Sequence, residues 1–243
     1  MSGFFIIFNQ IIVLVCFTNY FCSLKTSEKI KKFTILGILF LLPITAYLFF
    51  SSGVNNFAKL PVLTKGVLEI DQFESENKVK KELQNHLTIL CFFGNDLELT
   101  QSNAFNLAHK IYKKNYQFKD LQFIILTPRG TEPQIQNLKE KLSEIENPEN
   151  WNFVFGDTTE IQKVFNSLGS NYRLNKNFAS NQVFLIDKER NLRGRDDDED
   201  IGILYGFDSS NYSEINNKMD DDVRILLAEY RLALKKYNSK REI

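Results

Sequence analysis

An uncharged run near the N-terminus, FTILGILFLLPITAYLFF at 33–50, constrains this chain more than any other feature. A helix of about 20 apolar residues crosses the roughly 30 Å core of a bilayer, so the run is long enough to span a membrane. Pro43 does not exclude this, because proline is tolerated in membrane helices. A cleaved signal peptide is the alternative, but no small-x-small cleavage site follows and the run is long for a signal sequence. We therefore expect a retained transmembrane anchor.

Four lysines stand immediately before this run and predict its orientation. Lys25, Lys29, Lys31 and Lys32 lie in the segment 23–32. Positively charged loops stay in the cytoplasm, so this segment is expected to be a basic cytoplasmic loop. The residues after the anchor then lie on the outer side. For a bacterium, the expected location is the inner membrane, with the soluble domain in the periplasm.

The apolar segment 1–22 leaves two interpretations open. It can be a second transmembrane helix that forms a hairpin with the anchor, or the result of a start codon assigned too far upstream. Neither Cys16 nor Cys22 follows the small residue that a lipoprotein signal requires. The only other cysteine is Cys91, so a disulfide framework is not expected.

The charge balance bears on the class of partner. The chain has 30 basic and 30 acidic residues, and its formal net charge is zero. Proteins that bind nucleic acid usually carry a basic surface, and no basic stripe stands out here. We therefore expect no nucleic-acid partner, and a membrane as the first partner of the chain.

Apolar runs alternate with amphipathic segments through the rest of the sequence. Strands are predicted at 67–70, 87–93, 120–127, 151–156, 181–187 and 191–195. Helices are predicted at 101–115, 132–145, 157–168 and 213–236. This alternation is typical of an α/β fold with a mostly parallel sheet, and the last two strands add an antiparallel edge. The order is that of a thioredoxin-like mixed sheet flanked by helices, preceded by one or two N-terminal transmembrane helices.

The chain is thus expected to fall into consecutive parts with different environments. They are an apolar segment at 1–22, a cytoplasmic loop at 23–32, an anchor at 33–50, a linker at 51–66, an extracytoplasmic domain at 67–237 and a tail at 238–243.

Three collinear segments resemble one branch of the thioredoxin-like superfamily. LTPRGTEPQIQNLKEKL (126–142) is similar to a VDPxRDTPExLxxY motif, NWNFVFGDTTEIQKV (150–164) to WxFLTGDxxxI, and SNQVFLIDKERNLRGR (180–195) to HSxxxxLIDxxGxxRG. These motifs are those of the Sco/SenC family, membrane-anchored proteins that bind copper and help to assemble cytochrome c oxidase. The resemblance covers roughly residues 65–195.

The resemblance also implies where a copper site would lie. Family members carry a CxxxC motif after the first core strand and a histidine before the LID strand, a soft ligand set that suits copper. Aligned on these motifs, Leu97 and Gln101 stand at the cysteine positions and Ala179 at the histidine position. We therefore expect a degenerate site with no catalytic residue, no cofactor and no bound metal.

Cys91 and the two histidines are the remaining candidate ligands. Cys91 lies inside the apolar strand LTILCFF, where a free cysteine normally acts as a small core residue. A reactive thiol would need exposure and electropositive neighbours. His86 precedes this strand and His109 lies on the following helix. Neither histidine has a cysteine or histidine at ligand spacing.

The acidic run DDDED at 196–200 is a candidate ion-binding loop through Asp196, Asp197 and Asp198. Oxygen-rich loops bind Ca²⁺, but the spacing of an EF-hand is absent and arginines stand beside the run. A solvated extension of a hairpin is the expected structure. The run MDDDV at 219–223 is expected to place carboxylates in the first part of the last helix, where they suit the helix dipole.

The sequence therefore favours a membrane-anchored, non-catalytic Sco-like module that binds or scaffolds a membrane or periplasmic protein. The alternative is an extracytoplasmic copper carrier or thiol oxidoreductase that uses Cys91 with a histidine. A third hypothesis is a recognition domain stabilised by an ion in the acidic loop.

Overall fold

A computed structural model describes residues 28–52, 59–76 and 78–241 of the chain. The chain divides into two compact units, 1–56 and 57–243, and each is described by itself. The predicted second apolar helix at 1–22, with Cys16 and Cys22, lies outside the described residues.

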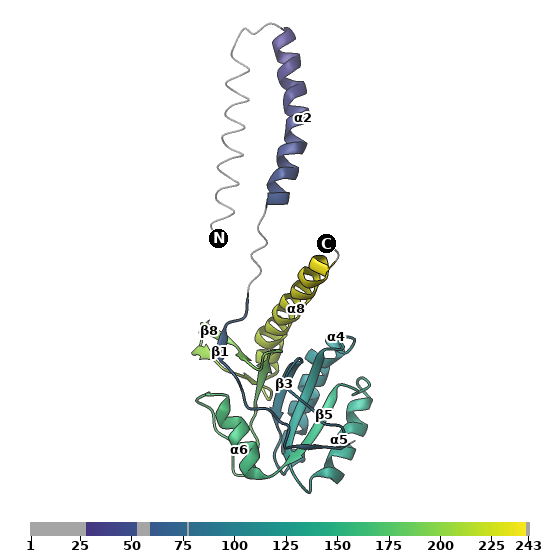
Figure 1. Cartoon of the computed structure of the whole chain (residues 1–243), viewed down its shortest axis with the longest axis vertical. Coiled ribbons are helices and arrows are strands. Elements are labelled where there is room, and N and C mark those ends of the chain that lie inside the picture. The colour runs from purple at the N-terminus through teal and green to yellow at the C-terminus, as the bar shows by residue number, and fades with distance from the viewer. Residues whose placement is uncertain (1–27, 53–58, 77, 242–243) are drawn as a thin grey trace. The chain divides into compact units, whose positions relative to one another are not determined.

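The described part of the first unit is one helix, α2 (Glu28–Ser52), drawn in purple in Figure 1. Its segment Ile30–Leu48 has a mean hydropathy of 1.6 and buries no side chain. Pro43 lies inside the helix without ending it. The predicted anchor is therefore a helix that is long and apolar enough to be a candidate membrane span.

The second unit is built on a mixed sheet with the strand order β1-β7-β6-β3-β4-β5-β2, and β10 pairs with β6 outside this path. The strands are β1 (Val62–Thr64), β2 (Glu74–Ser75), β3 (Leu87–Phe92), β4 (Leu121–Pro128), β5 (Trp151–Gly156), β6 (Gln182–Ile186), β7 (Leu192–Arg193) and β10 (Phe207–Asp208). β3, β4 and β5 are parallel to one another, whereas the β6–β7 hairpin and the edge strands run antiparallel. β8 (Arg195–Asp198) and β9 (Gly202–Leu204) form a separate hairpin.

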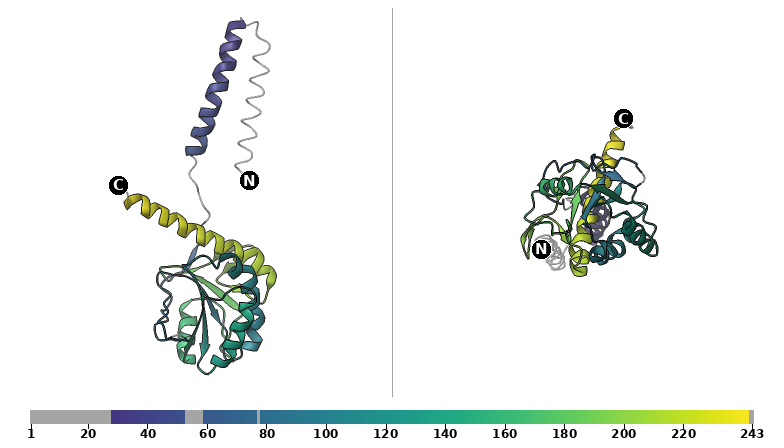
Figure 2. Two further views of the ribbon diagram at one scale, coloured as in Figure 1. Left: turned by 90° about the vertical axis from the view of Figure 1, so that its right-hand side faces the viewer. Right: turned by 90° about the horizontal axis from the view of Figure 1, so that it is seen from below.

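Helices cover both faces of the sheet (Figures 1 and 2). They are α3 (Leu97–Leu107), which continues through the π-helical turn η1 (Ala108–Tyr112) into α4 (Lys113–Asn115), then α5 (Glu132–Ser143), α6 (Thr158–Ser167), and α7 (Tyr212–Glu214), which continues through η2 (Ile215–Met219) into α8 (Asp220–Arg241). One hydrophobic core lies between one face of the sheet and the helices α3, α5 and α8, and a second core lies between the opposite face and α6.

Alternation along β3 explains why both faces are buried. Ile89 and Cys91 belong to the core beneath α3, α5 and α8, while Leu90 and Phe92 belong to the core beneath α6. A central strand covered by helices on both sides reads as a continuous apolar run, as LTILCFF does. The predicted fold class, a thioredoxin-like mixed α/β sheet flanked by helices, is confirmed.

Four local predictions differ from the structure. The range 51–66 assigned to linker contains β1, so its last residues belong to the sheet. The predicted strand at 67–70 is a loop, in which the N–H of Val67 donates to the carbonyl oxygen of Arg190. The predicted loop at 196–200 begins inside β8, and α3 begins at Leu97 rather than at residue 101.

Candidate functional site

The loop between β3 and α3 lies where a thioredoxin-like fold carries its reactive groups. Gly94 in this loop has a φ of +68°, a left-handed conformation that favours glycine. A Cβ at this position would overlap the backbone oxygen of Asn177 and approach the Cβ of Ala179 to 2.9 Å. The N–H of Asn95 donates to the same Asn177 oxygen at 3.0 Å. The loop and the segment that carries Ala179 are therefore in direct backbone contact.

Ala179, which stands at the expected histidine position, also contacts the residue before Gly94. It forms an isolated antiparallel bridge with Phe93, at the end of β3. The next residue, Ser180, donates its N–H to the carbonyl oxygen of Phe92 at 2.9 Å. The fold thus brings Ala179 to the end of β3, but a methyl group has no ligand atom to offer.

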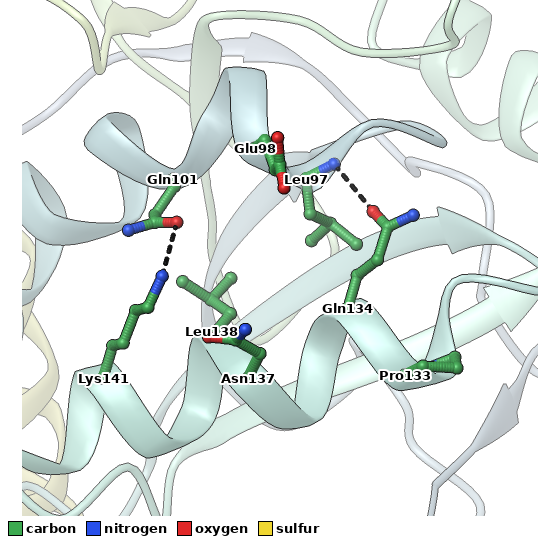
Figure 3. A pocket seen from close by; sticks show the side chains of 8 residues that line it. All are labelled: Leu97, Glu98, Gln101, Pro133, Gln134, Asn137, Leu138 and Lys141. Atoms are coloured by element: carbon green, nitrogen blue, oxygen red, sulfur yellow. Dashed lines mark hydrogen bonds between the residues drawn. The ribbon is translucent and has the colours of Figure 1, made fainter.

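Leu97 and Gln101 lie one turn apart on the first part of α3, and both residues form a hydrogen bond with a side chain of α5 (Figure 3). The backbone N–H of Leu97 donates to Oε1 of Gln134 at 3.1 Å. The Oε1 atom of Gln101 accepts a hydrogen bond from Nζ of Lys141 at 3.2 Å. A free N–H at a helix start can stabilise a thiolate or another anion, and here a side-chain amide from α5 occupies it.

A shallow pocket of about 220 Å³ lies between the two helices. It is lined by Leu97, Glu98, Gln101, Pro133, Gln134, Asn137, Leu138 and Lys141 (Figure 3). Its polar groups are two glutamines, an asparagine, a carboxylate and an ammonium. The lining holds neither a thiol nor a histidine, so the pocket offers contacts for a partner but no nucleophile with an adjacent base.

Cys91 points into the core rather than toward this pocket. Its side chain is fully buried and packs among the apolar residues beneath α3, α5 and α8. Burial raises the pKa of its thiol far above the usual range, because a thiolate would be desolvated there. The thiolate is the form that attacks disulfides and binds metals. Cys91 is therefore held in its unreactive form.

The two histidines do not approach Cys91. His86 is half-buried just before β3, and the extended chain from it to Cys91 spans about 17 Å. His109 is exposed on η1. Among residues 28–52, 59–76 and 78–241, no group of three or more histidine, cysteine, aspartate or glutamate side chains is arranged to hold a metal ion.

Some carboxylates of the acidic run 196–200 are exposed to water, and one is buried in the protein. Asp196 and Asp197 on β8 are exposed, whereas Asp198 is buried and accepts two hydrogen bonds of 2.8 Å from Nζ of Lys218. Burial alone would raise the pKa of Asp198, but the bonds and charge of Lys218 and two backbone N–H groups outweigh it and lower the pKa. The ammonium group of Lys218 thus occupies the place beside Asp198 that a bound metal cation would need. The prediction that the acidic run is a solvated hairpin extension is wrong for Asp198, which is buried.

The carboxylates of the MDDDV run stand in the first turn of α8, as expected, and two of them are also buried in ion pairs. Asp222 is buried and accepts hydrogen bonds of 2.8 and 2.9 Å from Arg195. Burial raises the pKa of Asp222, although Arg195 opposes this effect. Asp220 is buried too and pairs with Lys114 at 2.7 Å. These ion pairs fasten the β8–β9 hairpin and α4 to α8.

A second buried cluster surrounds Arg193 on β7. Its guanidinium donates to the backbone oxygen of Leu60, to Asp187 at 3.2 Å and to Glu229 of α8 at 2.7 Å. Glu229 also accepts a 2.8 Å hydrogen bond from the N–H of Leu60. The signal in the sequence was the RGR motif beside the acidic run, but two of the partners, Leu60 and Glu229, lie far away along the chain. The cluster joins β1, β7 and α8.

No protein-family model and no curated protein matches this sequence. Among solved structures, similar folds include a candidate protein disulfide isomerase from Bacteroides thetaiotaomicron, at 11% identity and a TM-score of 0.48 over 70% of this chain and 95% of that one. Copper-bound ScoI of Bradyrhizobium japonicum has 14% identity and a TM-score of 0.43, over 67% and 99% of the two chains. Copper-bound ScoI of Arabidopsis thaliana has 15% identity and a TM-score of 0.42, over 66% and 98%. At these identities the likeness concerns the fold alone.

Proposed function

We propose that this chain is a membrane-anchored, non-catalytic thioredoxin-fold module of Sco-like type that works as a binding or scaffold protein. One observation carries the proposal. Aligned on the Sco/SenC motifs, Leu97 and Gln101 stand where that family has its cysteine pair, and both residues are hydrogen-bonded to α5, through Gln134 and Lys141. Ala179 takes the third position. A scaffold that keeps the geometry of a site but has lost its ligands can still bind a partner.

The proposed location is a bacterial inner membrane, with the domain in the periplasm. The candidate span Ile30–Leu48 and the lysines before it support this orientation. A reporter that is active only in the periplasm, fused after Lys236, is expected to be active. An inactive fusion would place the domain in the cytoplasm and overturn this part of the proposal.

The proposed partner is a membrane or periplasmic protein. The resemblance to the Sco/SenC motifs suggests a respiratory oxidase or its assembly machinery. The pocket between α3 and α5 gives such a partner a surface without catalytic groups, and the side chain of Leu99 on α3 is 66% exposed.

Copper binding separates this function from the alternative of a copper carrier. The full chain in detergent, carrying Cys16→Ser and Cys22→Ser to remove the other thiols, is titrated with Cu(I) against a competing chelator. We expect no stoichiometric binding, because the remaining thiol is buried. Tight binding of one Cu(I) that Cys91→Ser abolishes would establish the carrier instead.

A matched variant tests whether the assay can detect a site on this scaffold. Leu97→Cys, Gln101→Cys and Ala179→His together supply two thiolates and an imidazole, a ligand set that suits Cu(I). In the same serine background, this variant is expected to bind one Cu(I) while the parent binds none. Failure of the variant to bind would show that the loop geometry differs from that of a copper site.

A further inference from the structure

The C-terminal part of α8 leaves the domain that its first part helps to build. Leu226 and Leu227 are buried in the core, and Tyr230 packs its ring against Phe118 at 5.7 Å. Beyond this point Leu232 and Leu234 are 39% and 42% exposed. Figure 2 shows the end of α8, in yellow, projecting from the domain. An isolated helix end is marginal in water, so a helix that continues here calls for a second surface.

The sequence of this projecting end is basic and amphipathic. RLALKKYNSKREI, from residue 231 onward, has five basic residues and one acidic residue in a chain with no net charge. The basic residues are Arg231, Lys235, Lys236, Lys240 and Arg241. Leu227 and Tyr230 pack against the domain, and Leu234 and Tyr237 continue the same side of the helix by their spacing in the sequence. A basic helix with an apolar stripe is typical of a segment that lies on an anionic membrane surface.

The chain enters the domain from the anchor right beside this projecting end. Leu60, a buried residue at the start of the described part of the second unit, donates its N–H to Glu229 of α8 at 2.8 Å. The connection from Ser52 to Leu60 can reach at most about 27 Å. The helix from Glu229 to Arg241 is about 18 Å long. If α2 crosses a bilayer, covalent connectivity allows the end of α8 to reach that bilayer surface.

We propose that residues 231–241 of α8 bind the anionic lipid headgroups of the membrane that α2 crosses. This inference rests on the proposed anchoring role of α2. Lysine and arginine near an anionic surface are attracted to it, and the exposed Leu234 can enter the boundary between headgroups and acyl chains. A second copy of the chain is a poorer occupant, because it would bring two strongly basic segments together. The contact would hold the domain at two points, by the connection at Leu60 and by the end of α8.

Hydrogen exchange of the full chain in lipid nanodiscs tests this contact. One copy is incorporated per disc, either in phosphatidylcholine alone or in phosphatidylcholine mixed with phosphatidylglycerol. The amides of 232–241 are expected to exchange about tenfold more slowly in the anionic discs. The amides of 223–228 lie in the packed part of α8 and serve as an internal reference that does not change.

Two charge variants make the test specific. Lys235→Gln, Lys236→Gln and Lys240→Gln together are expected to abolish the protection by anionic lipid. The matched set Lys80→Gln, Lys163→Gln and Lys176→Gln removes three exposed lysines outside α8 and is expected to leave the protection unchanged.

Each other outcome overturns the proposal in a recognisable way. Equal exchange in both lipids refutes binding to anionic headgroups. Protection that appears only when two copies share a disc assigns the surface to a second copy. Failure of the chain to enter discs would instead refute the anchoring role of α2, which is part of the proposed function, so the two failures are distinguishable.

Discussion

Replacing Arg193 by leucine is expected to lower the free energy of unfolding by about 3 kcal/mol. The guanidinium is 9% exposed and donates to the backbone oxygen of Leu60 and to the carboxylates of Asp187 and Glu229. Leucine removes the shared cation and leaves two carboxylates and a carbonyl without it. Breaking a buried ion pair on one side costs about 3–5 kcal/mol, and we take the lower end because the side chain of Glu229 stays 19% exposed.

The fluorescence of Trp151 provides the assay. This residue is the only tryptophan, is 3% exposed, and stacks on Phe123 with ring centroids 4.8 Å apart. Urea unfolding of the full chain in detergent, followed at this residue, gives the free energy and the m value for each variant. Arg173→Leu is the matched control, because this arginine is exposed, and it is expected to stay within about 0.5 kcal/mol of the parent.

A double variant separates the cluster from loss of packing alone. Adding Glu229→Leu to Arg193→Leu removes one of the two carboxylates that lost their cation. The double variant should therefore lose about 0.5–3 kcal/mol less stability than the sum of the two single variants. A loss of less than about 1 kcal/mol for Arg193→Leu at an unchanged m value would refute the reasoning, since it would mean that water already satisfies these groups.

Three further results are expected. Cys91 should resist alkylation in the native chain at pH 8 and react in urea, as peptide mass analysis would show; rapid native labelling would contradict its burial. Gly94→Ala should lower the melting temperature more than Gly130→Ala, because a Cβ at Gly94 overlaps backbone whereas at Gly130 it meets nothing within 4 Å; equal shifts would count against this. Asp198 has a lowered pKa, so its contribution to stability is complete above its unfolded pKa, near 4, and is lost as the pH falls through the folded value. Unfolding measured between about pH 5 and pH 3 should thus show a smaller loss for Asp198→Asn than for the parent, and parallel curves would disprove the role of Lys218.

The central strands could be predicted because both of their faces are buried. The range predicted for β5 coincides with Trp151–Gly156, and β3 and β4 lie within their predicted ranges to about a residue. β1 could not be found in this way, since it has only three residues and Val62 is 43% exposed. Conversely, Val67 and Ile70 are fully buried and resemble a strand in sequence, yet their backbone follows a loop that bonds to the turn before β7.

The candidate site was predictable only in part, because some of its contacts join elements that are distant in the sequence. Motif spacing placed Leu97 and Ala179, and the structure brings both to the end of β3. The spacing could not show that Gln134 occupies the helix start, because that contact joins two helices. The burial of Asp198 in the acidic run could not be predicted either, because its partner Lys218 is 20 residues away and no local sequence pattern connects the two.

The hydrogen bonds that join Leu60 to Arg193 and Glu229 also have a mechanical consequence. Any tension between the anchor and a partner held by the domain must pass through this point, because it is where the connection joins the fold. There the load divides between the β1–β7 edge and α8, through the hydrogen bonds of Arg193 and Glu229. The central strands β3 and β4, which position Leu97 and its pocket, are therefore not the first elements to take that load.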